Sequence, residues 1–266
     1  MVPAAAELSG AWNFRDTAAA TGIRPGRLFR SSELSELDDR GRDTMRHLGI
    51  TDVADLRSDR EVQRRGPGLV SAGVQIHLLP FYVAAPDAPR FDVSGAPHEQ
   101  AFDRLTSGAS GADIETAAAQ YMTQEYQRFP ILDGAHIAVR QVISLLADGK
   151  PVIAHCFAGK DRTGFTVATV LSAIGVDRDS VRADYLRSNA AVPQLRTSIL
   201  ANIAAHGEPD PHIEARLTES VLGVRDQYLD AAFAVIDDTY GSLPHYLAAI
   251  GVTDDQLARL RSELTG

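Results

Sequence analysis

Cysteine is almost missing from this chain of 266 residues, which holds a single one, Cys156. One thiol can form no internal disulfide, and this composition fits a reducing compartment. Chemistry that passes electrons between several thiols, such as arsenate reduction, is therefore disfavoured. A lone cysteine is still sufficient for nucleophilic catalysis.

Long apolar runs and an excess of positive charge are also missing. No apolar stretch is long enough to cross a bilayer, so we expect no stable membrane insertion. Residues 1–10 have neither a basic start nor an apolar segment, which predicts no conventional signal peptide and a cytoplasmic location. The formal net charge of −9 disfavours a nucleic-acid partner and a basic membrane-binding face.

Lysine is scarce, because only Lys150 and Lys160 occur among the 26 basic residues. Lys160 falls within the motif described next, where a compact ammonium suits a crowded anion pocket better than a second guanidinium. Two plainer interpretations of Lys160 stay open. One is that a lysine occurs at this position by chance, and the other is that Lys160 is a solvated surface cation.

The single cysteine stands in a short motif with a defined setting. Residues 155–164 read His-Cys-Phe-Ala-Gly-Lys-Asp-Arg-Thr-Gly, after a small apolar strand at 151–154 and before an apolar run at 165–174. A loop between a strand end and a helix start collects backbone N–H groups, which bind anions and favour the thiolate of Cys156. The planar fork of Arg162 can grip two phosphate oxygens. The pattern predicts transfer of a phosphoryl group to sulfur.

The motif resembles the phosphate-binding loop of the protein tyrosine phosphatase superfamily, and in particular that of the bacterial tyrosine and phosphoinositide phosphatases. Further stretches carry the same resemblance, at residues 11–16, 24–34, 55–58, 184–189 and 240–242. It implies a hydrolase of phosphoric monoesters that forms a cysteinyl-phosphate and needs no metal or cofactor. It also implies phosphotyrosine proteins and phosphoinositides as substrates, and export to a host with a part in virulence. The oligomeric state stays open.

The resemblance and the chemistry together assign roles within the loop. Cys156 is the expected nucleophile, Arg162 the expected transition-state clamp, and Asp161 the favoured general acid. The residues expected to bind phosphate are Phe157, Ala158, Gly159, Lys160, Arg162 and Thr163. We expect His155 to orient the loop by hydrogen bonds rather than to act as the acid.

Two aspartates are candidates for the general acid. In the resembling family an aspartate commonly follows the strand that ends at Pro80-Phe81, but here Tyr82 and Val83 follow. Asp87 is the nearest acid there and competes with Asp161. A carboxylate beside phosphate is repelled, so Asp161 must hold a proton or point toward the leaving group. The plainer alternative is that Asp161 braces the loop through Arg57 or a backbone amide.

Alternating helices and short apolar strands predict an α/β fold, with a mostly parallel sheet flanked by helices and an α-rich C-terminal half. We expect one domain over residues 1–266, with a flexible insertion at 84–112. Strands are predicted at 27–30, 51–56, 74–79 and 152–155. Helices are predicted at 38–48, 117–129, 133–146, 165–174, 195–205, 211–222, 224–239, 244–250 and 254–264. Residues 210–235 are predicted either as a two-helix lid over the pocket or as ordinary core.

Two other functions stay open from the residues alone. A sulfurtransferase also uses a cysteine loop, but it has no need of the Arg162-Thr163-Gly164 helix start. A phosphate-binding module without activity is disfavoured by the presence of both Cys156 and Arg162. Asp55 and Arg57, at the end of a predicted strand, either position the loop or form a surface ion pair.

Overall fold

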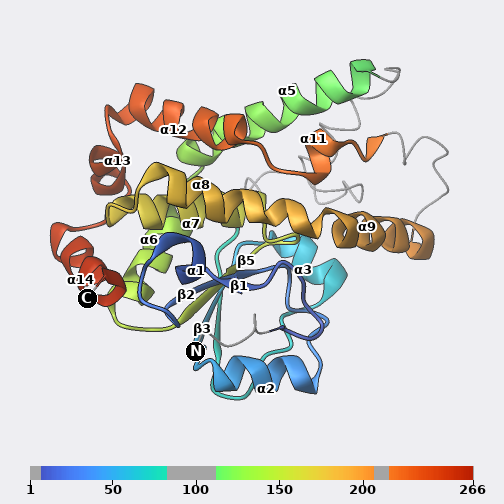
Figure 1. Cartoon of the computed structure of the whole chain (residues 1–266), viewed down its shortest axis with the longest axis horizontal. Helices are drawn as coiled ribbons and strands as arrows, with labels where there is room; N and C mark the ends of the chain where they lie inside the picture. The colour runs from blue at the N-terminus through green and yellow to red at the C-terminus, as the bar shows by residue number, and fades with distance from the viewer. Residues whose placement is uncertain (1–6, 83–111, 207–215, 266) are drawn as a thin grey trace.

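The computed structural model describes residues 7–82, 112–206 and 216–265. Its centre is a five-stranded sheet in the order β1-β2-β5-β3-β4. The strands are β1 (Arg15–Asp16), β2 (Leu28–Ser31), β3 (Asp52–Asp55), β4 (Gln75–Leu78) and β5 (Val152–His155). β1 runs antiparallel to β2, and all other neighbours are parallel. The predicted mostly parallel sheet is confirmed, and β5 lies at its middle (Figure 1).

Helices make up most of the remaining described chain. They are α1 (Ala18–Thr21), α2 (Asp39–His47), α3 (Asp59–Arg65), α5 (Ala112–Arg128), α6 (Asp133–Ala147), α7 (Asp161–Ala173), α8 (Arg178–Leu186), α9 (Val192–His206), α11 (Glu219–Leu222), α12 (Asp226–Tyr240), α13 (Leu243–Ala249) and α14 (Asp254–Thr265), with 3-10 turns η1 (Phe129–Ile131) and η2 (Arg187–Ala191). The predicted α-rich C-terminal half is confirmed. Strand β1 and helices α1, α3 and α8 lie outside the predicted ranges.

One predicted helix is wrong in its extent. A continuous helix was expected over 211–222, but the chain bends at Leu217 and Thr218 is extended (φ −74°, ψ 162°). The helix α11 therefore begins only at Glu219. Residues 211–215 lie outside the described residues, as does the predicted insertion over residues 84–111. The single-domain prediction stays a prediction.

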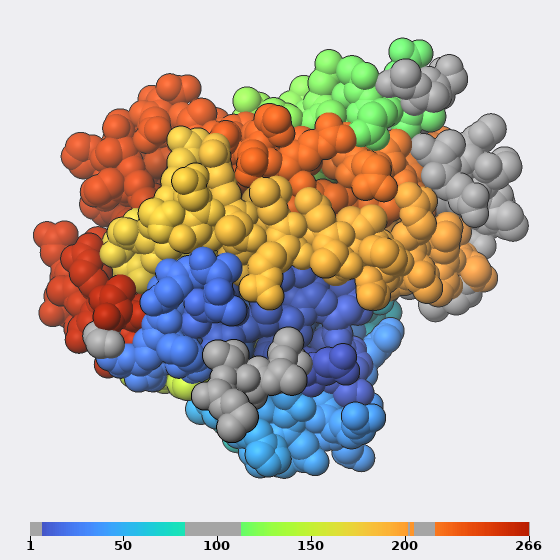
Figure 2. Space-filling view, in the orientation of Figure 1, coloured from blue at the N-terminus to red at the C-terminus, as the bar shows by residue number. Residues whose placement is uncertain are grey.

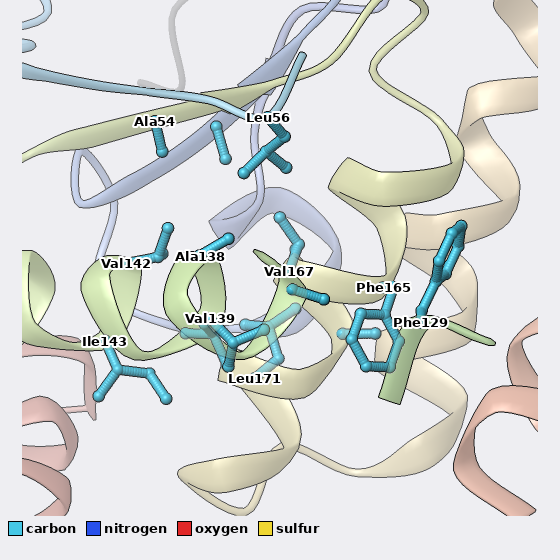
Figure 3. Close-up of a cluster of buried hydrophobic side chains, with 14 of the residues drawn as sticks. Ala54, Leu56, Phe129, Ala138, Val139, Val142, Ile143, Phe165, Val167 and Leu171 are labelled. Atoms are coloured by element: carbon cyan, nitrogen blue, oxygen red, sulfur yellow. The ribbon is translucent and has the colours of Figure 1, made fainter. Parts of the chain in front are cut away.

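Every residue of β2, β3 and β5 is buried, so the central strands of the sheet are covered on both faces. Phe29, Val53 and Ile153 pack with Met45 of α2 on one face. Their neighbours in the strands, including Ala54 and Ala154, face the opposite way and join the larger core. Figure 3 shows Ala54 above the side chains of α6 and α7 in that core.

Helix α7 is the structural support of the site. Every residue from Arg162 to Leu171 is buried. The helix packs against β5, α6 and α8 (Figure 1). Because its sides are all covered, its first turn is held in a fixed position at the end of β5.

The helices at the C-terminal end pack mainly into the core. Tyr228 and Leu229 of α12 are buried there, and Phe233 packs against the same cluster. This placement corresponds to the core alternative for this part of the predicted lid. Among the described residues no single helix is long and apolar enough to cross a bilayer, and the bent pair that passes by length and composition, Asp113–Ile131 with Asp133–Ala147, contributes to the core.

Candidate active site

The loop at residues 156–160 joins the end of β5 to the start of α7 and lies at the carboxyl edge of the sheet. Cys156 is the first residue after β5, and its side chain is only 2% exposed. None of the hydrogen bonds found among the described residues is donated by the backbone N–H groups of residues 157–161. These N–H groups are therefore available to an anion at the helix start.

The loop is held from its outer side through its carbonyl groups. Asn13 donates from Nδ2 to the carbonyls of Ala158 and Gly159, at 3.0 Å in both cases. Arg30 donates from Nη2 to the carbonyl of Gly159 at 2.8 Å. A peptide whose carbonyl faces outward directs its N–H the other way, so these bonds orient the loop for anion binding.

Position 159 requires glycine for two reasons, which are its backbone conformation and the close approach of a neighbouring strand. Its φ is +65°, and a Cβ atom there would lie 2.0 Å from the carbonyl oxygen of Ser31. Gly159 was predicted to bind phosphate. The structure adds that the loop backbone presses against β2 at this position.

Arg162 is buried, and its hydrogen bonds fix which edge of the guanidinium faces the expected phosphate. Its Nη1 and Nη2 each donate to one oxygen of Glu61 at 2.7 Å, and Nη1 also donates to the carbonyl of Leu56 at 3.2 Å. These bonds use one end of the guanidinium and leave Nε–H and the second N–H of Nη2. Burial lowers the pKa of Arg162, but the charge of Glu61 outweighs it and holds that pKa well above its ordinary value.

Sequence reasoning gave Glu61 no role. The residue lies in the first turn of α3, where Ser58 and Glu61 form a reciprocal capping box. The Glu61 carboxylate thus caps α3 and orients Arg162 at the same time. The Ser-x-x-Glu spacing after the β3 strand was the available signal, although it indicates a helix start rather than an arginine partner.

Asp55 and Arg57 form a buried ion pair rather than a surface one. Arg57 donates to Asp55 at 2.7 Å and to Glu33 at 2.9 Å, and all three residues are at most 5% exposed. The backbone N–H of Glu33 donates to the carbonyl of Phe157 at 3.0 Å. This cluster supports the loop through Glu33, and Arg57 is not the partner of Asp161.

His155 lies fully buried below the loop. Its Nδ1 is 3.1 Å from the carbonyl of Cys156, and since a carbonyl only accepts, Nδ1 is the donor. Burial lowers the pKa of His155, partly opposed by the charge of Asp55. The histidine therefore fixes the backbone at the nucleophile.

Asp161 is the first residue of α7, and its side chain is 24% exposed. Its Oδ1 accepts from the Tyr126 hydroxyl and from Lys160 Nζ, both at 2.9 Å. Lys160 Nζ also donates to the carbonyl of Gly223 at 3.2 Å and is only 5% exposed, so it is not a solvated surface cation. The competing acid, Asp87, lies outside the described residues.

The remaining predicted residues line the same loop. The Thr163 hydroxyl is buried, and within the described part of the chain it has no hydrogen-bond partner. Phe157 meets the edge of Trp12 and stacks under the Arg65 guanidinium, 4.6 Å from the ring centroid. Ala158 packs in a small apolar cluster with α9 and α11, whose buried members also include Leu195, Leu217 and Leu222.

A buried ion triad lies behind the loop. Asp184 of α8 accepts from Arg15 Nε at 2.8 Å and from Arg30 Nη1 at 2.7 Å. Burial, together with the charge of Arg30, lowers the pKa of Arg15 to about 10. Figure 2 shows α8 and α9 as a gold-to-orange band against the blue N-terminal segment, and the triad joins these two regions. Through Arg30 the triad reaches the loop carbonyls.

Comparison with known proteins agrees with this geometry. A model of the tyrosine phosphatase family matches residues 6–266. The chain is 55% identical to the triple specificity protein phosphatase PtpB of Mycobacterium tuberculosis, over 98% of this chain and 99% of that protein. It is 30% identical to a putative tyrosine-protein phosphatase of Cupriavidus necator, over 88% of this chain and 80% of that protein. It is 26% identical to a tyrosine-protein phosphatase of Nostoc commune, over 92% and 76% of the two chains.

Proposed function

The chain belongs to the tyrosine phosphatase family, and from that premise we propose how its residues remove phosphate from phosphotyrosine and from further classes of monoester. The observation that carries the mechanism is the loop itself. A buried thiol occurs at one helix start together with backbone N–H groups and an edge of Arg162 that form no hydrogen bond within the described part of the chain.

In the first step, the Cys156 thiolate attacks phosphorus and the bond from phosphorus to the ester oxygen breaks. Asp161 donates a proton to the departing oxygen, so the alcohol or phenol leaves neutral. The loop N–H groups and the free edge of Arg162 bind the three equatorial oxygens. Because Glu61 already fixes the guanidinium, this clamp needs little rearrangement as the transition state forms.

In the second step, water attacks the cysteinyl-phosphate. Asp161, now ionised, accepts a proton from that water, and the sulfur leaves as thiolate. The Thr163 hydroxyl is buried and without a partner among the described residues, so it can donate to the departing sulfur. The products are inorganic phosphate and the regenerated enzyme.

We propose a broad substrate range that includes phosphotyrosine, phosphoserine or phosphothreonine, and monophosphoinositides. The name of the Mycobacterium tuberculosis relative, a triple specificity phosphatase, supports this breadth. So does Lys160, an ammonium at the loop beside the expected phosphate position. Cellular location, including export to a host, stays a prediction, and the oligomeric state stays open.

The substrate range is tested by turnover of three substrates under one set of conditions. They are a phosphotyrosine peptide, the matching phosphoserine peptide and a monophosphoinositide in mixed micelles, with Cys156→Ser as the inactive control. We expect turnover of all three and loss of all three in the control. Turnover of the phosphotyrosine peptide alone would contradict the proposed breadth and leave the phosphatase activity in place.

The acid role of Asp161 is tested by the leaving group. Asp161→Asn should reduce kcat by about 10²–10⁴-fold with phenyl phosphate, whose leaving oxygen needs a proton. With para-nitrophenyl phosphate, whose leaving group is stable as an anion, the loss should be much smaller. Asp148→Asn is a matched control, because Asp148 pairs with Arg259 at the surface. Equal losses with both esters would refute the acid role.

A further inference from the structure

Two buried tyrosines form a chain of hydroxyl groups that ends on Asp161. The Tyr185 hydroxyl donates to the Tyr126 hydroxyl at 2.7 Å, and the Tyr126 hydroxyl donates to Asp161 Oδ1 at 2.9 Å. Tyr126 is 0% exposed and Tyr185 1% exposed. They come from α5 and α8, so two helices far apart in the sequence converge on one carboxylate.

We propose that Tyr126, oriented by Tyr185, is a positioning residue that fixes which oxygen of Asp161 exchanges the proton with the substrate. This inference rests on the proposed acid role of Asp161. It adds that the proton is carried by Oδ2, because Oδ1 is held by the tyrosine chain. Sequence reasoning assigned no role to either tyrosine.

The two carboxylate oxygens of Asp161 have different partners. Oδ1 accepts from Tyr126 and from Lys160, both at 2.9 Å, whereas among the described residues Oδ2 meets only Lys160 Nζ, at 2.8 Å. An oxygen that already accepts two hydrogen bonds is a poor site for a proton. Oδ2 therefore takes the proton, and the fixed Oδ1 prevents the carboxyl group from rotating away.

Asp161 determines the direction in which the two tyrosine hydroxyl groups donate their hydrogen bonds. An ionised Asp161 only accepts, so Tyr126 must donate to it and receive from Tyr185. Burial, followed by the charge of Asp161, raises the pKa of Tyr126 well above its ordinary value. Burial likewise raises the pKa of Tyr185 well above its ordinary value. Both phenols therefore remain protonated and serve as fixed donors rather than as exchangeable acids.

The rings are fixed as firmly as the hydroxyl groups. A Cβ atom on Gly164 of α7 would lie 2.9 Å from the Tyr185 ring, so that ring packs against the helix that carries Asp161. The Tyr126 ring packs against Tyr185 and Tyr228, with centroids 6.2 Å and 5.6 Å apart. A carboxylate held by such rigid donors stays within the narrow range of geometry that proton transfer needs.

Tyr126→Phe tests the inference, since it removes one hydroxyl and keeps the ring. We expect kcat to fall about tenfold to 100-fold with phenyl phosphate, with little change in KM and a much smaller loss with para-nitrophenyl phosphate. Added to Asp161→Asn, the substitution should cause no further loss. Tyr246→Phe is the matched control, because Tyr246 is buried and its hydroxyl has no partner among the described residues.

The outcomes separate the inference from the function on which it rests. Equal losses with both esters in Tyr126→Phe, or losses that multiply with those of Asp161→Asn, would overturn the inference. If Asp161→Asn itself shows no dependence on the leaving group, the acid role fails first. Should Tyr126→Phe fail to fold, Tyr185→Phe takes its place. It should show a smaller loss with the same dependence, and equal losses there would overturn the inference.

Discussion

Replacing Arg162 with lysine is expected to lower kcat for phosphotyrosine substrates by about 10³–10⁵-fold, the contribution of an arginine that stabilises the transition-state charge in phosphoryl transfer. A lysine ammonium cannot hold both oxygens of Glu61 and present two parallel N–H groups to phosphate. The guanidinium is suited to both tasks. Its Nη1 and Nη2 each donate to one oxygen of Glu61 at 2.7 Å, and its Nε–H and the second N–H of Nη2 remain for phosphate.

The measurement is steady-state turnover, with circular dichroism to confirm that the variant is folded. Arg182→Lys is a suitable control, since Arg182 forms a similar pair with Asp230 but is 27% exposed on α8. That variant should retain full activity. Activity of Arg162→Lys within about tenfold of the native enzyme would show that bidentate phosphate binding is not essential here.

Replacing Asp184 with asparagine is expected to lower the free energy of unfolding by about 3–5 kcal/mol, because it leaves two buried arginines without their counter-charge. Asp184 is 1% exposed and pairs with both Arg15 and Arg30. Burial raises its pKa, but the two arginines outweigh burial and hold that pKa below its usual 3.8. Since the folded pKa is depressed, this stabilisation is present above pH 3.8 and is lost as the pH falls through the folded pKa.

Urea unfolding at neutral pH checks this effect. Asp230→Asn is the control, because Asp230 forms exposed pairs with Arg178 and Arg182, and a loss of at most about 1 kcal/mol is expected there. An equal, small loss in both variants would show that the triad does not stabilise the fold. Activity of Asp184→Asn should also fall, since Arg30 would no longer hold the Gly159 carbonyl in place.

The roles of residues within one loop could be predicted from the sequence. Cys156, Asp161 and Arg162 lie in one short motif between a strand and a helix, and the structure places them together at that helix start. The mostly parallel sheet followed from alternating helices and short apolar strands. Local patterns were sufficient here because the strand, the loop and the helix are consecutive.

Contacts between residues distant in the sequence could not be predicted in this way. Glu61 is 101 residues from Arg162, and Tyr126 is 35 residues from Asp161. Nothing local to a glutamate in a capping box or a tyrosine on an apolar helix face identifies such a contact. The bend at Leu217 was missed for a related reason, since an apolar spacing compatible with a helix does not exclude a break in it.

During turnover the phosphoryl group is expected to pass through the sulfur of Cys156. Mixing the enzyme with a phosphotyrosine peptide, quenching in acid within the first turnovers and locating the modification by peptide mass spectrometry tests this step. We predict the mass of one phosphoryl group on the peptide that contains Cys156, and none in Cys156→Ser. Hydrolysis at an undiminished rate by Cys156→Ser, or a phosphoryl group trapped on any other residue, would contradict the account.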